Sequence, residues 1–217
     1  MQYIGIDLSG PSNHKDTSLV SFIPSGNKLR YDHSLVGASD EQIIKYIDEI
    51  SKTEKTVVGI DAPLSYQDGG GDRPLDKSLR KYARGLGMKS GSIMTPTFSR
   101  MVYLTVRGIH LAHCLQVVCP QDVTVLEVHP GCVFAGRAGL QNLFHVLDYK
   151  KSLESRAWLF KWMSDYGLTG LDNLNKSSTH VLDACAAAIA AWEFDKQIED
   201  FFFYPSQPPL HPFPFFS

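Results

Sequence analysis

The fold is decided by Tyr3-Ile4-Gly5-Ile6-Asp7, a short apolar run that ends on an aspartate. The same pattern returns in Val57-Val58-Gly59-Ile60-Asp61. Apolar runs of this length, rich in Ile and Val and followed by turn residues or proline, are typical of buried strands. A helical pattern precedes the second run, and a helical crossover makes two strands parallel. Both aspartates are therefore expected at carboxyl ends of strands, where open α/β sheets bind their ligands.

Outward from these two runs, the pattern predicts an α/β chain with a mixed sheet. Ser39 and Gln42 form a capping-box pattern at the start of a helix with an apolar stripe of isoleucines. Turn residues, proline and alternation place strands at residues 2–8, 17–22, 29–36, 56–61 and 122–129. Helical periodicity places helices at residues 40–51, 75–84, 105–117, 150–166 and 179–196. The first three strands are expected to form an antiparallel meander.

A third acid, Asp183, lies in an alanine-rich helical stretch that is apolar nearly all round and is expected to be buried against the sheet. His180 shares its helix face. Glu127 shares a strand face with two valines and lies near the end of the fifth strand. A buried carboxylate costs several kcal/mol unless a cation meets it. The acids Asp7, Asp61 and Asp183, with Glu127 as a fourth member, therefore predict a site for a hard divalent cation.

Each of these acids also has a structural interpretation. Asp7 is followed by turn residues, and Asp61 lies two residues before a proline, so both could shape the chain locally. Asp183 and His180 could form a buried hydrogen bond, and Glu127 could be a surface residue of its strand. The sequence alone leaves these alternatives open.

Composition indicates one large domain over residues 1–200, because 217 residues with 43% hydrophobic content are ordinary for a globular chain. The start of the chain lacks the features of a signal peptide, and the longest apolar run, residues 184–192, is too short to cross a bilayer. We therefore expect a cytoplasmic location and no membrane partner. The four cysteines show no C-x-x-C pairing and are expected to be reduced thiols.

The net charge of −2 does not indicate a nucleic-acid binder, but the charge is unevenly distributed. Between residues 73 and 107, eight basic residues stand against the single acid Asp76, which gives a local charge of +7. This segment is either a solvated helix face or a polyanion track that leads to the carboxylates.

The tail, residues 201–217, holds six phenylalanines and five prolines. Proline forbids a continuing helix, and so much exposed aromatic surface would be a liability. We expect the tail to pack across the body or against a partner chain. An interaction tail, through which a homo-oligomer could form, is the alternative.

Together these motifs resemble the DUF429 family, whose members are described as predicted nucleases of the ribonuclease H-like fold. The resemblance extends over residues 2–195 and is carried by Gly5-Ile6-Asp7-Leu8-Ser9-Gly10, Gly59-Ile60-Asp61-Ala62-Pro63-Leu64-Ser65, Arg73 with Asp76 and Arg80, Thr105-Val106-Arg107-Gly108, Glu127-Val128-His129-Pro130, Tyr149-Lys150 and Leu182-Asp183-Ala184-Cys185-Ala186-Ala187. It implies five strands in the order 3-2-1-4-5, with strand 2 antiparallel. The tail has no counterpart in that pattern.

The resemblance also implies a chemistry. In related integrase-like and junction-resolving enzymes, acids of the first strand, the fourth strand and a late helix hold two Mg²⁺ or Mn²⁺ ions, and Asp7, Asp61 and Asp183 match those places. His180 resembles a second ligand on the helix. On this hypothesis two cations clamp a phosphodiester of a nucleic acid or another substrate. Phosphates would be held by Arg73, Arg80, Arg107 and Lys150.

Two other classes of function compete with this hypothesis. A nucleotide phosphotransferase of the actin and sugar-kinase kind begins with a similar strand, aspartate and turn, but needs two copies of the fold, and this chain has room for one. A non-catalytic nucleic-acid-binding or scaffold protein could have kept the fold, in which case the acids would be structural and no metal would bind tightly.

Overall fold

The computed structural model describes residues 1–119, 122–176 and 178–217, which form an α/β fold around one mixed sheet. Over these residues the sheet has eight strands in the order β6-β3-β2-β1-β4-β5-β8-β7. The strands are β1 (Gln2–Asp7), β2 (Ser18–Ser25), β3 (Lys28–Val36), β4 (Thr56–Asp61), β5 (Val123–Glu127), β6 (Leu168–Thr169), β7 (Phe203–Tyr204) and β8 (Phe215–Phe216). All five predicted strands are present, but three strands of two residues extend the edges, so the predicted number of five was too low.

The pairing of the long strands brings the first two aspartates together. β1 is antiparallel to β2 and parallel to β4, and β4 is parallel to β5. β2 and β3 form an antiparallel hairpin. In the parallel pair of β1 and β4, Asp7 is the direct neighbour of Asp61. The two acids therefore lie side by side at the carboxyl end of the sheet.

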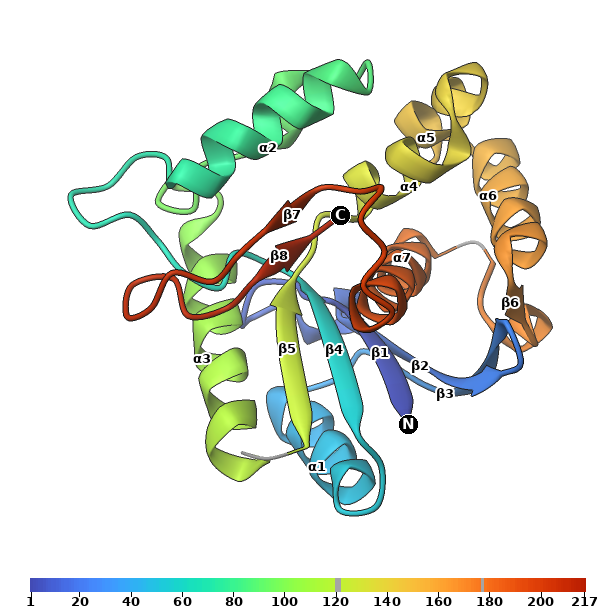
Figure 1. The fold of residues 1–217 in the computed structure, drawn as a ribbon, viewed down its shortest axis with the longest axis horizontal. Helices are drawn as coiled ribbons and strands as arrows, with labels where there is room; N and C mark the ends of the chain where they lie inside the picture. Colours follow the sequence, from blue (N-terminus) through green and yellow to red (C-terminus); the bar gives the residue numbers. More distant parts are fainter. Residues whose placement is uncertain (120–121, 177) are drawn as a thin grey trace.

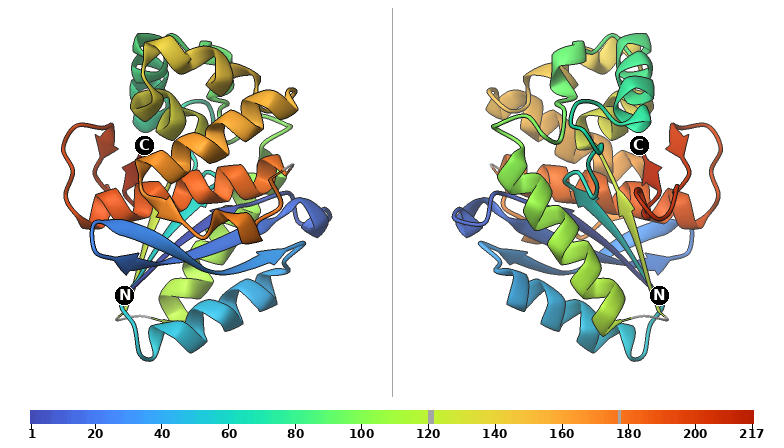
Figure 2. Two further views of the ribbon diagram at one scale, coloured as in Figure 1. Left: turned by 90° about the vertical axis from the view of Figure 1, so that its right-hand side faces the viewer. Right: turned by 90° about the vertical axis from the view of Figure 1, so that its left-hand side faces the viewer.

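Helices cover both faces of this sheet (Figures 1 and 2). In the described part of the chain there are seven α-helices: α1 (Asp40–Ser51), α2 (Pro74–Gly85), α3 (Val102–Val118), α4 (Pro130–Ala138), α5 (Leu143–Asp148), α6 (Leu153–Tyr166) and α7 (Thr179–Asp195). Figure 2 shows α1 and α3 on one face and α7 on the other, with α6 lying outside α7. One hydrophobic core fills each side, and α7 is buried almost all round, as its alanines predicted.

The helix predictions were right where a cap marks the start and wrong around residues 130–152. The capping box is confirmed, since the Gln42 amide donates to Ser39 Oγ and the Ser39 amide to Gln42 Oε1. Pro130 ends β5 as expected but also begins α4, with the ring of His129 accepting from the Cys132 amide. The predicted helix at 150–166 starts too early, because Ser152 caps α6 at Leu153.

The tail packs on the body, which is one of the two expectations from its sequence. Phe215 of β8 pairs with Glu127 of β5, and β7 runs antiparallel to β8. Phe215 and Phe216 are buried. The backbone amide of His129 donates to Ser217 Oγ, so the tail also holds the chain that follows β5.

Two further expectations concern membrane-spanning helices and the state of the cysteines. No helix among the described residues is both long and apolar enough to cross a bilayer. All four cysteines are free thiols, and Cys119, Cys132 and Cys185 are buried.

Candidate metal centre

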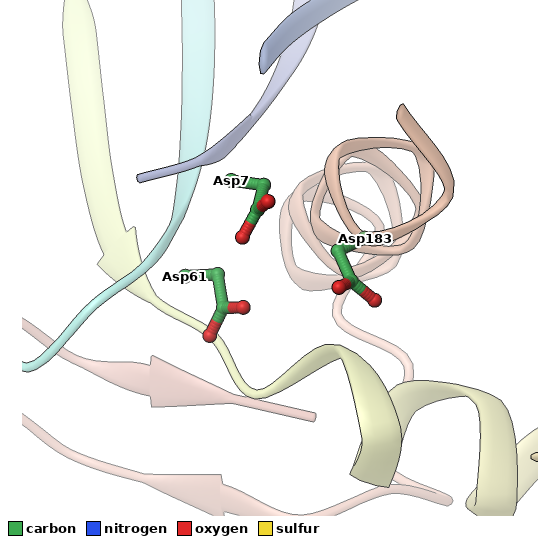
Figure 3. Close-up of side chains that lie close together, drawn as sticks. All are labelled: Asp7, Asp61 and Asp183. Atoms are coloured by element: carbon green, nitrogen blue, oxygen red, sulfur yellow. The ribbon is translucent and has the colours of Figure 1, made fainter. Parts of the chain in front are cut away.

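Three carboxylates that are distant in sequence meet in one place. Asp7 comes from the end of β1, Asp61 from the end of β4 and Asp183 from the second turn of α7. One oxygen atom of each lies within 4.8 Å of an oxygen of the others. Figure 3 shows the three side chains pointing toward a common space between the strand ends and the helix. The predicted convergence of these acids is confirmed.

Two glycines let α7 come close enough for Asp183 to reach the strands. A Cβ atom on Gly5 would lie 1.8 Å from the carbonyl oxygen of Ala184. A Cβ atom on Gly59 would lie 2.4 Å from the carbonyl oxygen of Ala187. Since the two glycines are neighbours in the β1–β4 register, they form one flat area of sheet on which the backbone of α7 rests directly. The separation of the acids is therefore fixed by contact between backbones.

Asp183 and Asp7 each have hydrogen-bonding partners that orient the carboxylate. Tyr149 Oη donates to Asp183 Oδ1 at 2.5 Å, and Lys150 Nζ donates to Asp183 Oδ2 at 3.0 Å. His180 Nδ1 lies 2.6 Å from Asp7 Oδ2, and its Nε2 lies 3.8 Å from Asp16 Oδ1. Lys150 and His180 thus lie beside the acids, but they bind different ones: the ammonium group is near Asp183 and the imidazole is near Asp7.

The charges at this centre do not balance. Burial, and then the charge of Asp183, raise the pKa of Asp7 well above its ordinary value, although Lys150 lowers it in part. Burial and the charge of Asp7 likewise raise the pKa of Asp61. Burial lowers the pKa of Lys150, but the carboxylates, Asp183 first, raise it more, and the net shift is upward. Two of the acids therefore hold protons more firmly than usual, which is the response expected when carboxylates crowd together without enough cations.

Glu127, the predicted fourth acid, is held by a different partner. Its two carboxylate oxygens accept from Arg73 at 2.6 and 2.8 Å, and the amide of Leu64 donates to it at 2.8 Å. Arg73 also binds Asp76 through its Nε and Nη2 atoms. All three charged side chains are buried. Glu127 lies in the same cleft as the acids, yet its charge is neutralised by this network.

The other predicted phosphate ligands are also engaged by the protein. Arg107 is buried, and it donates to Asp40 Oδ1 at 2.8 Å and to Thr17 Oγ1 at 2.7 Å. Arg80 forms an ion pair with Asp72 and donates to the carbonyl of Ile93 at 2.9 Å. These arginines join α2 and α3 to neighbouring loops. Of the four predicted substrate ligands, Lys150 alone lies beside the acids.

Asp7 and Asp61 line a cleft of about 290 Å³, and Asp183 lies next to them. Arg73, Glu127 and Lys150 also line the cleft. Residues of the segment between α2 and α3, together with the start of α3, line the cleft as well: Ser92, Ile93, Met94, Met101 and Leu104.

His129 borders the cleft and is held as a neutral ring. Its Nδ1 accepts from the Cys132 amide, so its Nε2 carries the proton and lies 3.3 Å from the carbonyl of Ser92. Burial lowers the pKa of His129. Both ring nitrogens are occupied, which leaves His180 as the histidine next to the acids.

The donor set fits a hard divalent cation. Three carboxylates offer only oxygen atoms, which are the ligands that Mg²⁺ and Mn²⁺ prefer. Burial, and then repulsion between the carboxylates, raise the pKa values of Asp7 and Asp61, and a bound cation would offset both. His180 could add one nitrogen donor through Nε2.

Sequence reasoning missed one residue with a part in the site. The hydroxyl of Tyr149 donates to Asp183, and burial raises the pKa of this phenol, so that it stays a donor. Its position next to Lys150 was the available signal, but the partner of Tyr149 lies 34 residues away. No local pattern identifies such a contact.

Comparison with known proteins adds a family and nothing on activity. The family model described as "Protein of unknown function (DUF429)" matches residues 5–207. No curated protein and no solved structure matches the chain.

Proposed function

The chain belongs to the DUF429 family, and from this premise we propose that it is a Mg²⁺- or Mn²⁺-dependent phosphodiesterase of the nuclease class. The observation that carries this proposal is the meeting of Asp7, Asp61 and Asp183 within 4.8 Å along an open cleft, with Lys150 as the nearby cation. Carboxylates that lie close together with too few cations lower the stability of the fold. Their presence here therefore favours a functional role for the three acids over a structural one.

We further propose that the fold is ribonuclease H-like. The central strands follow the order β3-β2-β1-β4-β5, and β2 is antiparallel to β1. The acids come from β1, β4 and a late helix. This arrangement supports the proposal because it places the acids where enzymes of that fold hold their metal ions.

The chemistry divides between the metal and the chain. When bound, one or two divalent cations would supply positive charge for the attacking water and the leaving oxygen. Asp7, Asp61 and Asp183 would hold these cations, and Tyr149 would keep Asp183 in its orientation. Lys150 would neutralise the charge of a phosphate that approaches Asp183. His180, half-exposed and 2.6 Å from Asp7, is placed to take or give a proton at the cleft.

We propose fewer phosphate-binding residues than the sequence predicted. Arg73 and Arg107 are buried and fully engaged with carboxylates and neighbouring oxygens. Releasing Arg73 would leave the buried acids Asp76 and Glu127 without a partner, at a cost of about 3–5 kcal/mol. We therefore assign them to the support of the cleft and omit Glu127 from the proposed metal ligands.

Calorimetric titration with Mn²⁺ tests the proposal. Wild-type protein should bind Mn²⁺, and Asp7→Asn should lose the binding heat. Asp172→Asn is the matched control, because the side chain of Asp172 is 94% exposed in a surface ion pair. Equal heats for wild type and Asp7→Asn would refute the metal site.

A cleavage screen with the same proteins tests the reaction. Single-stranded and duplex DNA and RNA are incubated with Mn²⁺, and products should form with wild type and Asp172→Asn but not with Asp7→Asn. If Mn²⁺ binds through Asp7 and no phosphodiester is cut, the enzymatic proposal fails and a binding or scaffold protein on this fold is favoured.

A further inference from the structure

We propose that the cleft takes a single-stranded nucleic acid, whose bases stack on Phe98 and Tyr103 and whose phosphates bind Lys89 and Arg100. This inference rests on the proposed function and names the class of its substrate. It starts from the segment between α2 and α3, which forms one wall of the cleft through Ile93, Met94 and Met101.

Large apolar side chains of this segment point into solvent. Phe98 is 51% exposed and Tyr103, in the first turn of α3, is 71% exposed. The backbone carbonyl of Phe98 accepts from the amide of Val102, so Phe98 adjoins the turn that carries Tyr103. Met94 lines the cleft and is also exposed, and it lies four residues before Phe98 in the same segment. Large exposed apolar side chains that gather in one segment beside a cleft favour a binding site there.

The charge of the same segment identifies the ligand. Residues 77–119 contain seven lysines and arginines and not one Asp or Glu, in a chain whose net charge is −2. Arg80 and Arg107 are used in ion pairs with Asp72 and Asp40. The remaining five are exposed: Lys77, Lys81, Arg84, Lys89 and Arg100. Aromatic rings set among cations are suited to a polyanion with flat apolar groups, which describes a nucleic acid.

A single strand fits this surface better than a duplex. The base faces of a duplex are stacked on one another and cannot reach a protein ring, whereas those of a single strand are free to stack. The cleft at about 290 Å³ also has room for little more than a strand at the acids. A protein partner would be expected to bring acidic residues to so basic a rim, and it would not explain why the rim leads to a site for phosphodiesters.

The test measures binding of fluorescent oligonucleotides by anisotropy, in EDTA so that nothing is cut. The probes are single strands of about 12 nucleotides, a length typical of single-strand sites, and the duplex of the same sequence. Phe98→Ala and Tyr103→Ala should each weaken binding of the single strand by about 5- to 150-fold. Tyr103→Phe should bind as wild type does, because its ring is kept.

Matched controls lie away from the segment between α2 and α3. Phe203 is 51% exposed and borders a separate cavity beside Lys55 and Val57 at the start of β4, so Phe203→Ala should leave affinity unchanged. Lys89→Gln and Arg100→Gln should each lower the slope of log affinity against log salt by about 0.7. Lys28→Gln, at the start of β3, should not alter the slope.

Several outcomes would overturn the inference. Tighter binding of the duplex than of the single strand would do so, and so would wild-type affinity in both aromatic variants. A dimer in light scattering that Phe98→Ala converts to a monomer would assign the patch to a second copy of the chain.

The inference and the proposed function can fail separately. If Asp7→Asn and wild type give equal Mn²⁺ heats while Phe98→Ala still weakens binding of the single strand, the metal chemistry is wrong and the binding surface stands. If Mn²⁺ binding and phosphodiester cleavage depend on Asp7 but the aromatic variants bind normally, the reverse holds.

Discussion

Two clusters of buried charge lie in the same cleft and are built in opposite ways. Around Arg73, the carboxylates of Asp76 and Glu127 share one guanidinium group, and the Leu64 amide completes the shell of Glu127. Around Asp183, three carboxylates share one ammonium group, that of Lys150, whose side chain is largely exposed. Both clusters contain buried carboxylates, so the presence of buried acids alone does not distinguish them. The ratio of acids to cations does: in the first cluster one guanidinium group with five N–H donors serves two carboxylates, and in the second one ammonium group serves three, so the second lacks positive charge.

Glu127 resembled a metal ligand in the sequence because of its position. It lies at the end of β5 as Asp61 lies at the end of β4, and it is buried while Asp61 is half-buried. Its charge, however, is already used to hold Arg73. The completed cluster supports the wall of the cleft, and the incomplete one is available for a ligand.

Breaking the complete cluster should have the largest effect. Arg73→Met leaves two buried carboxylates without a cation, which should destabilise the fold by about 3–5 kcal/mol and lower Tm by about 6–20 °C. Thermal unfolding checks this. Arg80→Met, in the helix that Arg73 precedes as N-cap, is the control, because its partner Asp72 is partly exposed, and it should cost no more than about 1 kcal/mol. Equal losses in both variants would contradict the comparison.

Moving the incomplete cluster apart should come next. Gly5→Ala places a methyl group 1.8 Å from the carbonyl of Ala184 and must push α7 off the sheet. We expect a loss of about 1–3 kcal/mol, together with weaker Mn²⁺ binding because Asp183 moves with its helix. Gly10→Ala, where an added Cβ meets no atom within 4 Å, should change neither quantity. Unfolding and calorimetry are measured on both variants.

Removing one acid should stabilise the protein when metal is absent. The folded pKa of Asp7 is raised, so its protonated form stabilises the fold at low pH, and that contribution is lost as the pH rises from 3.8 through the folded pKa. At pH 7 in EDTA, the free energy of unfolding of Asp7→Asn should therefore exceed that of wild type by roughly 0.5–2 kcal/mol. The advantage should shrink toward pH 4. Greater stability of wild type at every pH would show that the carboxylates do not repel one another.

The smallest effect should come from the hydroxyl group that orients Asp183. Tyr149→Phe removes a hydrogen bond of 2.5 Å to a carboxylate, at a cost of about 0.5–1.5 kcal/mol in the free energy of unfolding. Its effect on Mn²⁺ affinity should be larger, about 10- to 100-fold. Tyr31→Phe, which loses a bond to the neutral hydroxyl of Ser34, should leave Mn²⁺ affinity unchanged. If both variants bind Mn²⁺ equally, Tyr149 has no part in the site.

Much of the fold could be predicted, because its main elements carry local signals. The register of β1 and β4 follows from two runs of the same length that end in aspartate, and α1 follows from a capping box. α4 was missed because proline is compatible both with the end of a strand and with the first position of a helix, as at Pro130. α5 was missed because it spans only six residues and has no side-chain cap. β7 and β8 are too short, and too rich in neighbouring prolines, to show a period.

The candidate site was predicted in its acids and not in its partners. Asp7, Asp61 and Asp183 stand out because each interrupts an apolar run, which is a property of the local sequence. The pairing of Glu127 with Arg73 joins residues 54 positions apart, and that of Arg107 with Asp40 joins residues 67 apart. Which cation meets which acid depends on the folded packing of loops and helices. Charge balance, the property that separates the two clusters, was therefore not visible before the structure.

The contact of α7 with Gly5 and Gly59 has a consequence for ion choice. Because main-chain atoms are in contact there, the three carboxylates cannot move apart to bind a larger ion unless α7, which is buried on nearly every side, moves away from the sheet. Mg²⁺ and Mn²⁺ are smaller than Ca²⁺, which favours more numerous and more distant oxygens. The centre should thus select by ionic radius, and an excess of Ca²⁺ should displace Mn²⁺ poorly.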